Sequence, residues 1–128
     1  MKKSSAKILI VEDEALIGWS LANALKKAGF TVVIAETGEK ALEKLSSSGY
    51  DLVITDLNLP HIDGFEVASF VKKFSSDIPV LMMTTKDKNF MNDPAHLTNV
   101  DNVIEKPFNL KEIITLVTEY THRKAACN

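Results

Sequence analysis

The sequence predicts an α/β domain built on a doubly wound, five-stranded parallel sheet with helices on both faces. Three observations support this prediction. Short runs of β-branched and aliphatic residues alternate with segments of helical periodicity along the 128 residues. The first four runs lack polar alternation, which is typical of strands that are covered on both faces. The composition is that of an ordinary globular domain, with 45% hydrophobic and 25% charged residues.

The predicted strands are continuous apolar runs that end at polar residues. The first strand is expected at residues 7–11, where an acidic stretch stops it abruptly. The next three are expected at residues 31–35, 52–55 and 78–83. A shorter and weaker run predicts the fifth strand at residues 102–105.

The first two predicted helices follow from side-chain periodicity and stop signals. Residues 15–28 repeat apolar side chains at helical spacing, and Gly29 follows as a C-terminal stop. Residues 37–45 begin at Thr37, a residue type that caps helices, and a serine cluster follows them. Each helix fills the gap between two strands, as crossover connections require.

Capping boxes predict where two later helices begin. Asp63 is followed three residues later by Glu66, a pattern that opens a helix through residue 74. Asn109 and Glu112 repeat the pattern before the last helix. In a capping box, each of the two side chains accepts a hydrogen bond from the other residue's backbone N–H.

The chain is expected to form one domain over residues 1–128, with an ordered core at about 6–122 and short polar tails. It contains no internal repeat, low-complexity segment or interdomain linker. Residues 88–99 are the least regular part. Pro94 lies among them, and a proline inside a helix costs about 3 kcal/mol or more, so a short or broken helix is expected there.

Charge and cysteine content exclude several classes of protein. The net charge of -2 and the pI of about 5.9 give no overall basic field for nucleic acid. The single cysteine, Cys127, excludes an internal disulfide framework. Lys2 and Lys3 precede an apolar run, but Glu12 and Asp13 interrupt it before it reaches signal-peptide or membrane length. We therefore expect a cytoplasmic domain with no membrane segment and no direct nucleic-acid binding.

Chemically active side chains gather at the carboxyl ends of the predicted strands. Glu12 and Asp13 follow the first strand, and Asp56 follows the third. Thr84 and Lys106 follow the fourth and fifth strands. Such sheets bind ligands beyond the carboxyl ends of their strands. Because the first and third strands are expected to be neighbours, the three carboxylates should lie within a few ångströms of one another.

This set of side chains favours phosphoryl chemistry. Clustered carboxylates repel one another unless a cation compensates them, and Mg²⁺ prefers oxygen ligands. Lys106 would add a fixed positive charge, and Thr84 would add a hydroxyl donor. Aspartate can act as a nucleophile that forms an acyl phosphate, so the group predicts a holder for a phosphoryl dianion on Asp56.

Four sequence pieces lie in order at the ends of these strands. They are VEDE at residues 11–14, DLNLPHIDG at 56–64, PVLMMT at 79–84 and EKPF at 105–108. On these pieces the chain resembles the receiver domain of bacterial two-component response regulators, of the chemotaxis-regulator-like kind, along essentially its whole length. The resemblance implies a flavodoxin-like three-layer sandwich with strand order 2-1-3-4-5.

The resemblance also implies a magnesium-dependent acceptor site. Asp56 would be the phosphoacceptor and would also bind the metal. Asp13 would be a direct Mg²⁺ ligand, and Glu12 would act directly or through water. Asn58 would contribute its backbone carbonyl.

On the phosphate side, the resemblance gives two further residues a role. Thr84 would bind a phosphoryl oxygen after modification, and Lys106 would pair with Asp56 or with its phosphate. The Lys106–Pro107 peptide bond is usually cis in this family.

The resemblance implies a signalling switch that catalyses only its own phosphorylation and dephosphorylation, and so is not classed as an enzyme. Its phosphoryl donor would be a sensor histidine kinase or a histidine phosphotransfer protein. Its output would pass to an effector domain or downstream protein that the sequence does not identify, and a phosphorylation-dependent dimer is an open possibility.

The sequence departs from the family in the region of its output surface. Val103 stands where receivers often carry an aromatic residue. Residues 97–101 replace a stretch that is often small, and Pro94 lies just before them. These departures concern the usual fourth-helix surface and not the acceptor chemistry.

Three other functions stay open from the sequence. A receiver-like module could work by binding alone, without phosphorylation. A magnesium-dependent aspartyl phosphohydrolase would need a second acid two residues after its nucleophile, where this chain has Asn58. A flavin or nucleotide carrier would need a glycine-rich loop after the first strand, and none is present.

Overall fold

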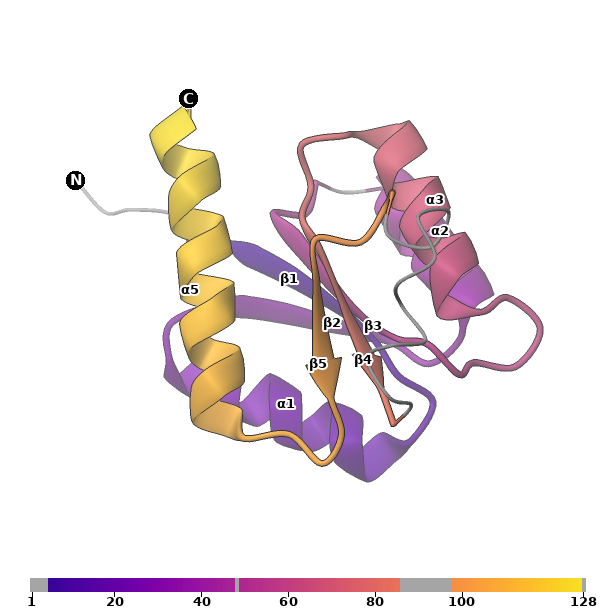
Figure 1. Ribbon diagram of the computed structural model, residues 1–128, viewed down its shortest axis with the longest axis horizontal. Helices are drawn as coiled ribbons and strands as arrows, with labels where there is room; N and C mark the ends of the chain where they lie inside the picture. The colour runs from indigo at the N-terminus through magenta and orange to yellow at the C-terminus, as the bar shows by residue number, and fades with distance from the viewer. Residues whose placement is uncertain (1–4, 48, 86–97, 128) are drawn as a thin grey trace.

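The computed structural model describes residues 5–47, 49–85 and 98–127. It confirms the predicted α/β architecture: a parallel sheet in the order β2-β1-β3-β4-β5 lies between layers of helices (Figure 1). The strands are β1 (Lys7–Val11), β2 (Thr31–Ala35), β3 (Leu52–Asp56), β4 (Val80–Thr84) and β5 (Asn102–Glu105). The described helices are α1 (Ala15–Lys27), α2 (Gly38–Ser47), α3 (Gly64–Phe74) and α5 (Leu110–Cys127).

The burial of the strands follows their position in the sheet. Every residue of β3 and β4 is buried, as expected for central strands covered on both faces. At one edge of the sheet, β2 is mostly half-buried. Covering on both faces was thus a correct prediction for the central strands and too strong for β2. The fourth strand begins at Val80 and not at Ile78, since Pro79 has no N–H to donate to a ladder.

The capping signals mark the helix starts as predicted. Asp63 and Glu66 form a complete capping box at the start of α3. Asn109 Oδ1 accepts hydrogen bonds from the backbone N–H groups of Lys111 (2.8 Å) and Glu112 (3.3 Å) at the start of α5. These contacts satisfy N–H groups that have no partner within their own helix.

Two more helix boundaries also follow from the sequence. Thr37 Oγ1 accepts a hydrogen bond from Lys40 N (3.0 Å) and caps α2. Gly29 has a φ of 103°, the left-handed conformation that ends a helix readily at glycine.

The C-terminal helix is longer than the sequence suggested. It continues to Cys127, past the expected end of the ordered core at residue 122. Lys124, Ala125 and Ala126 all have high helix propensity, which explains why the expected polar tail is helical. The short or broken helix expected around Pro94 lies outside the described residues, apart from a turn at residues 98 and 99.

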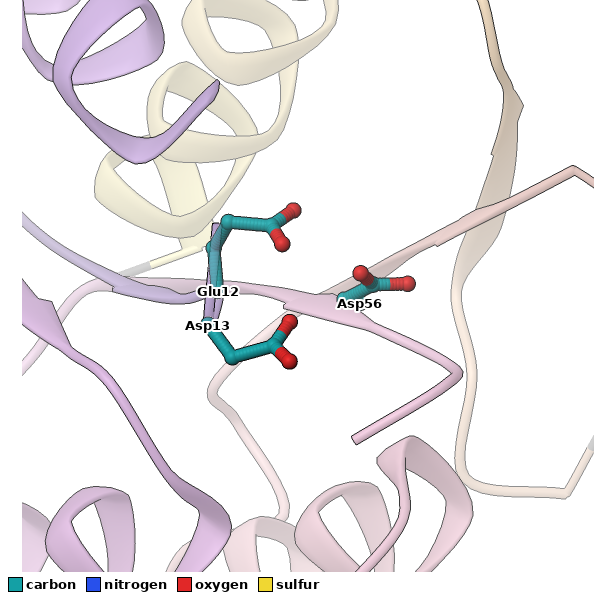
Figure 2. A group of neighbouring side chains, drawn as sticks. All are labelled: Glu12, Asp13 and Asp56. Carbon is teal, nitrogen blue, oxygen red and sulfur yellow. The ribbon is translucent and has the colours of Figure 1, made fainter. Parts of the chain in front are cut away.

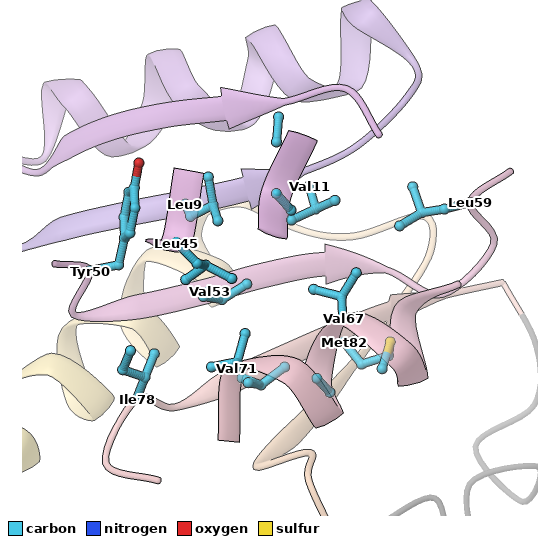
Figure 3. Packing of buried hydrophobic residues seen from close by; sticks show 14 of the residues in the cluster. Leu9, Val11, Leu45, Tyr50, Val53, Leu59, Val67, Val71, Ile78 and Met82 are labelled. Atoms are coloured by element: carbon cyan, nitrogen blue, oxygen red, sulfur yellow. The ribbon is translucent and has the colours of Figure 1, made fainter. Parts of the chain in front are cut away.

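The core consists of two apolar layers, one on each face of the sheet. Successive strand residues point to opposite faces, so Leu9 and Val11 enter one layer, whereas Ile8 and Ile10 enter the other. The first layer, drawn in Figure 3, is shared with α2 and α3. The second layer is shared with α1 and α5, which lie on the other side of the sheet in Figure 1.

The sheet register brings the predicted site residues to one edge. Val11 pairs with Thr55, so the residues that follow β1 lie beside Asp56. Asp56 pairs in turn with Met83, next to the end of β4. Within the described ranges, no helix has both the length and the apolar character needed to cross a membrane.

Candidate functional site

Three carboxylates converge at the carboxyl edge of the sheet. Glu12, Asp13 and Asp56 each offer one oxygen, and these oxygens lie within 4.8 Å of one another. Figure 2 shows the side chains of Glu12 and Asp13 directed toward Asp56. Glu12 and Asp56 are only 1% and 4% exposed, whereas Asp13 faces solvent. The convergence expected from the sequence is therefore confirmed.

Strand ladders and the loop after β3 hold the two buried acids in place. The N–H of Glu12 donates to Ala35 O (3.0 Å), which extends the pairing of β1 with β2 beyond the last strand residue. Asp56 is the last residue of β3, and its Oδ1 accepts a hydrogen bond from Asn58 N (3.2 Å). These contacts hold the backbone of Glu12 and the side chain of Asp56 in place.

Lys106 links the two buried carboxylates. Its Nζ lies 3.0 Å from Asp56 Oδ2 and 3.3 Å from Glu12 Oε1, with the lysine side chain 11% exposed. The backbone N–H of Lys106 donates to Thr84 O (2.8 Å), and the Lys106–Pro107 bond is cis as expected. The contact with Asp56 matches the sequence prediction, but the contact with Glu12 was not predicted.

The electrostatic environment shifts the pKa values of Glu12 and Lys106. Burial raises the pKa of Glu12 to about 7, with help from the negative charge of Asp56. A hydrogen bond from Glu14 N and the charge of Lys106 oppose this increase. For Lys106, burial lowers the pKa, but its hydrogen bonds and attraction to Asp56 and Glu12 raise the pKa overall. Lys106 therefore remains a cation, while Glu12 ionises near neutral pH.

Thr84 and Asn58 flank this group from β4 and from the loop after β3. Thr84 ends β4, and its side chain is fully buried. Asn58 is exposed in the loop after β3, where a pocket of about 430 Å³ opens between this loop and Asp13. The structure thus brings each predicted site residue to the same edge of the sheet.

A comparison with protein-family models identifies a family for this chain. The family model described as the response regulator receiver domain matches residues 8–118. The chain belongs to this family. Receiver domains of response regulators are signalling switches, and their fold is the flavodoxin-like one seen here.

Curated relatives of this receiver domain are larger regulators. It is 36% identical over 107 residues to the alkaline phosphatase synthesis transcriptional regulatory protein PhoP of Bacillus subtilis (strain 168), covering 84% of this chain and 45% of PhoP. It is 34% identical over 118 residues to the transcriptional regulatory protein QseB of Haemophilus influenzae, covering 92% of this chain and 53% of QseB. The chain spans about half the length of these relatives.

Solved receiver domains share the fold. A response regulator receiver domain protein from Clostridium thermocellum aligns with a TM-score of 0.88 at 22% identity, over 96% of this chain and 99% of that one. The response regulator protein TrrA of Thermotoga maritima, solved in complex with Mg²⁺-BeF, aligns with a TM-score of 0.82 at 33% identity. That alignment covers 90% of this chain and 98% of TrrA.

The acidic cluster of this receiver domain fits a Mg²⁺ ion. Its donors are carboxylate oxygens, the hard ligands that Mg²⁺ prefers, and three of them lie within 4.8 Å of one another. Asp13 and Asp56 would hold the ion, together with the backbone carbonyl of Asn58. Glu12, whose oxygens already contact Lys106 and Glu14 N, would act directly or through water.

Two residues that support Asp56 were not assigned a role from the sequence. Thr55 Oγ1 donates to Asp56 O (3.0 Å). Gly64 starts α3 so close to β3 that a Cβ there would lie 2.5 Å from Asp56 O. A glycine directly after the Asp63 cap was a sequence signal for such a close approach.

Proposed function

We propose that this receiver domain accepts a phosphoryl group on Asp56 in a magnesium-dependent reaction and then changes conformation. The donor would be a sensor histidine kinase or a histidine phosphotransfer protein. The observation that carries the proposal is the position of Asp56, which lies 3.0 Å from the Lys106 ammonium and beside two other carboxylates. Strong charge compensation around an aspartate is what phosphoryl transfer to a carboxylate requires.

The residues divide the reaction between them. An oxygen of Asp56 forms the new O–P bond, and the donor's P–N bond breaks with its electron pair leaving on the imidazole nitrogen. Lys106 compensates negative charge on the acceptor side, and the N–H of Asn58 orients the Asp56 carboxylate. A bound Mg²⁺ would supply further charge neutralisation of the phosphoryl oxygens.

The added charge would drive the switch. A phosphoryl group brings roughly two negative charges and strong hydrogen-bond acceptors to Asp56. Thr84, at the end of β4, would then bind a phosphoryl oxygen, and Lys106 would pair with the phosphate. Movement of these two residues would shift the backbone next to Thr84 and Lys106.

The output is proposed from the relatives. PhoP and QseB are named transcriptional regulatory proteins and are about twice as long as the matched region. By analogy, this receiver domain would control an effector domain or a downstream protein and would not contact nucleic acid itself. A cytoplasmic location and a phosphorylation-dependent dimer belong to the same proposal.

Labelling with a small acyl phosphate tests the acceptor assignment. Wild-type protein should be labelled only when Mg²⁺ is present, and Asp56→Asn should remove the label, because an amide cannot form the acyl phosphate. Asp51→Asn is a matched control, since Asp51 lies before β3 and its carboxylate contacts Lys7 N instead. Equal labelling of Asp56→Asn and wild type would disprove the assignment.

Two further assays separate the other functions. Binding without phosphorylation predicts no label on wild-type protein with any histidine kinase or phosphotransfer donor. Hydrolysis predicts turnover of a phosphomonoester above the level of Asp56→Ala. Asn58 offers no acid for hydrolysis. The contact of Asp56 with Lys106, beside two further carboxylates, favours an acceptor over binding alone.

A further inference from the structure

We propose that Gly38 is a positioning residue for the metal-binding edge, an inference that rests on the proposed function. Gly38 is the first residue of α2 and is buried. A Cβ at this position would lie 2.8 Å from Ile62 Cβ and 2.9 Å from Ile62 O. Ile62 belongs to the loop between Asp56 and α3. The first residue of α2 is therefore in close contact with the loop that follows Asp56.

The opposite end of this loop has a second close contact. Gly64 N donates to Leu57 O (2.9 Å), and a Cβ on Gly64 would lie 2.8 Å from Leu57 Cα. The loop over residues 57–63 is therefore held between the first residues of α2 and α3. At both contacts the glycine has no side chain that could separate the helix from the loop.

The loop between these contacts has little freedom to absorb a displacement. Asn58 N binds Asp56 Oδ1, and Ile62 N binds Pro60 O at 2.8 Å in a tight turn. His61, inside that turn, has a φ of 67°, a conformation that few non-glycine residues adopt. Outward movement of Ile62 is thus transmitted to Asn58, whose carbonyl is a proposed Mg²⁺ ligand.

Helix propensity alone makes the opposite prediction. Alanine is better than glycine inside a helix by about 1 kcal/mol, so Gly38→Ala should at worst leave α2 unchanged if Gly38 only starts the helix. The contacts with Ile62 predict instead that the new methyl group displaces the loop. A variant that stays folded but binds metal less well would separate these two roles.

The experiment is a calorimetric titration with Mg²⁺ alone, combined with amide hydrogen exchange of metal-free protein. We expect Gly38→Ala to weaken Mg²⁺ binding about tenfold, the effect typical of losing a group that orients a metal ligand. Exchange at Gly64 N and Asn58 N should become faster. Gly49→Ala is the matched control, because a Cβ there meets nothing within 4 Å.

A second variant changes the loop residue of the same contact. Ile62→Ala shortens the side chain that faces Gly38 and inserts nothing, so it stays informative if Gly38→Ala does not fold. We expect weaker Mg²⁺ binding and faster loop exchange here too. Unchanged Mg²⁺ affinity in both variants would overturn the role of Gly38. Absence of Mg²⁺ binding in wild type and Gly49→Ala would instead count against the proposed function.

Discussion

The Lys106 ammonium lies 3.0 Å from Asp56 Oδ2, although β4 lies between β3, which ends at Asp56, and β5, which Lys106 follows. The same Nζ also lies 3.3 Å from Glu12 Oε1, at the end of β1. A single side chain therefore reaches across the sheet edge and compensates two carboxylates that are almost fully buried. The site depends on this cation whenever no metal is bound.

Replacing Lys106 should destabilise the metal-free protein. Lys106→Met leaves Glu12 and Asp56 buried without their cation, and breaking a buried pair from one side is costly. At pH 8 with a chelator, we expect the free energy of unfolding to fall by about 3 kcal/mol. Because Mg²⁺ replaces the lost positive charge, it should restore more stability to this variant than to wild type. Urea denaturation with and without Mg²⁺ measures both effects.

An exposed lysine provides the control for this experiment. Lys40 pairs with Glu36 at 3.2 Å, but both side chains are more than half exposed. Surface pairs of this kind contribute little, so Lys40→Met should leave the midpoint of unfolding and its Mg²⁺ dependence nearly unchanged. Equal effects of the two substitutions would show that Lys106 does not compensate buried charge.

Glu12 should make the metal-free protein less stable as the pH rises. Its pKa is about 7 in the folded state, against an ordinary value of 4.5. Between these values the folded state binds more protons than the unfolded state, so this group's contribution to the free energy of unfolding falls with increasing pH. The contribution is fully present below pH 4.5 and is lost by the time the pH passes 7.

Glu12→Gln should remove this pH dependence. The difference in stability between wild type and the variant, measured in chelator by denaturation from pH 4.5 to 8, should change in favour of the variant as the pH rises. Glu36→Gln, at an exposed site, is the matched control. Parallel stability curves for wild type and Glu12→Gln would contradict the elevated pKa of Glu12.

His61→Gly should stabilise the protein. His61 has a φ of 67° in the loop after Asp56, and glycine adopts this conformation without steric cost. We expect the free energy of unfolding to rise by about 0.5–1 kcal/mol. His61→Ala keeps a Cβ in the same conformation and should bring no gain, so thermal denaturation of the pair separates backbone strain from loss of the imidazole.

Asp101 should be important at the opposite end of the sheet. Its Oδ2 accepts hydrogen bonds from Val80 N (2.7 Å) and Lys72 Nζ (2.8 Å), which ties the region before β5 to β4 and α3. Asp101→Ala removes the acceptor of the Val80 N–H, and we expect the free energy of unfolding to fall by about 2 kcal/mol. Lys72→Met leaves that backbone contact in place and should cost less. Urea denaturation of both variants shows which one loses more free energy of unfolding. A larger loss for Lys72→Met than for Asp101→Ala would contradict the prediction.

The helices and strands were largely predictable because their signals are local. The fifth strand was predicted at residues 102–105, where the structure has it, and the Asp63 capping box begins α3 as expected. The errors occurred where local rules compete. The second helix extends to Ser47 because the hydroxyls of Ser46 and Ser47 bond to carbonyls of their own helix instead of ending it.

The sequence by itself determined which residues lie at the carboxyl edge of the sheet. Glu12 and Asp13, Asp56 and Lys106 directly follow predicted strands, and a parallel sheet brings the carboxyl ends of its strands to one edge. Only the tertiary structure decided how these side chains are paired. The contact between Glu12 and Lys106 joins the ends of β1 and β5, and the close approach of Gly38 to Ile62 joins α2 to the loop after β3. Such contacts depend on how the helices and the sheet pack together. The periodicity of the sequence predicts each helix and strand, but not the distances between side chains of different elements.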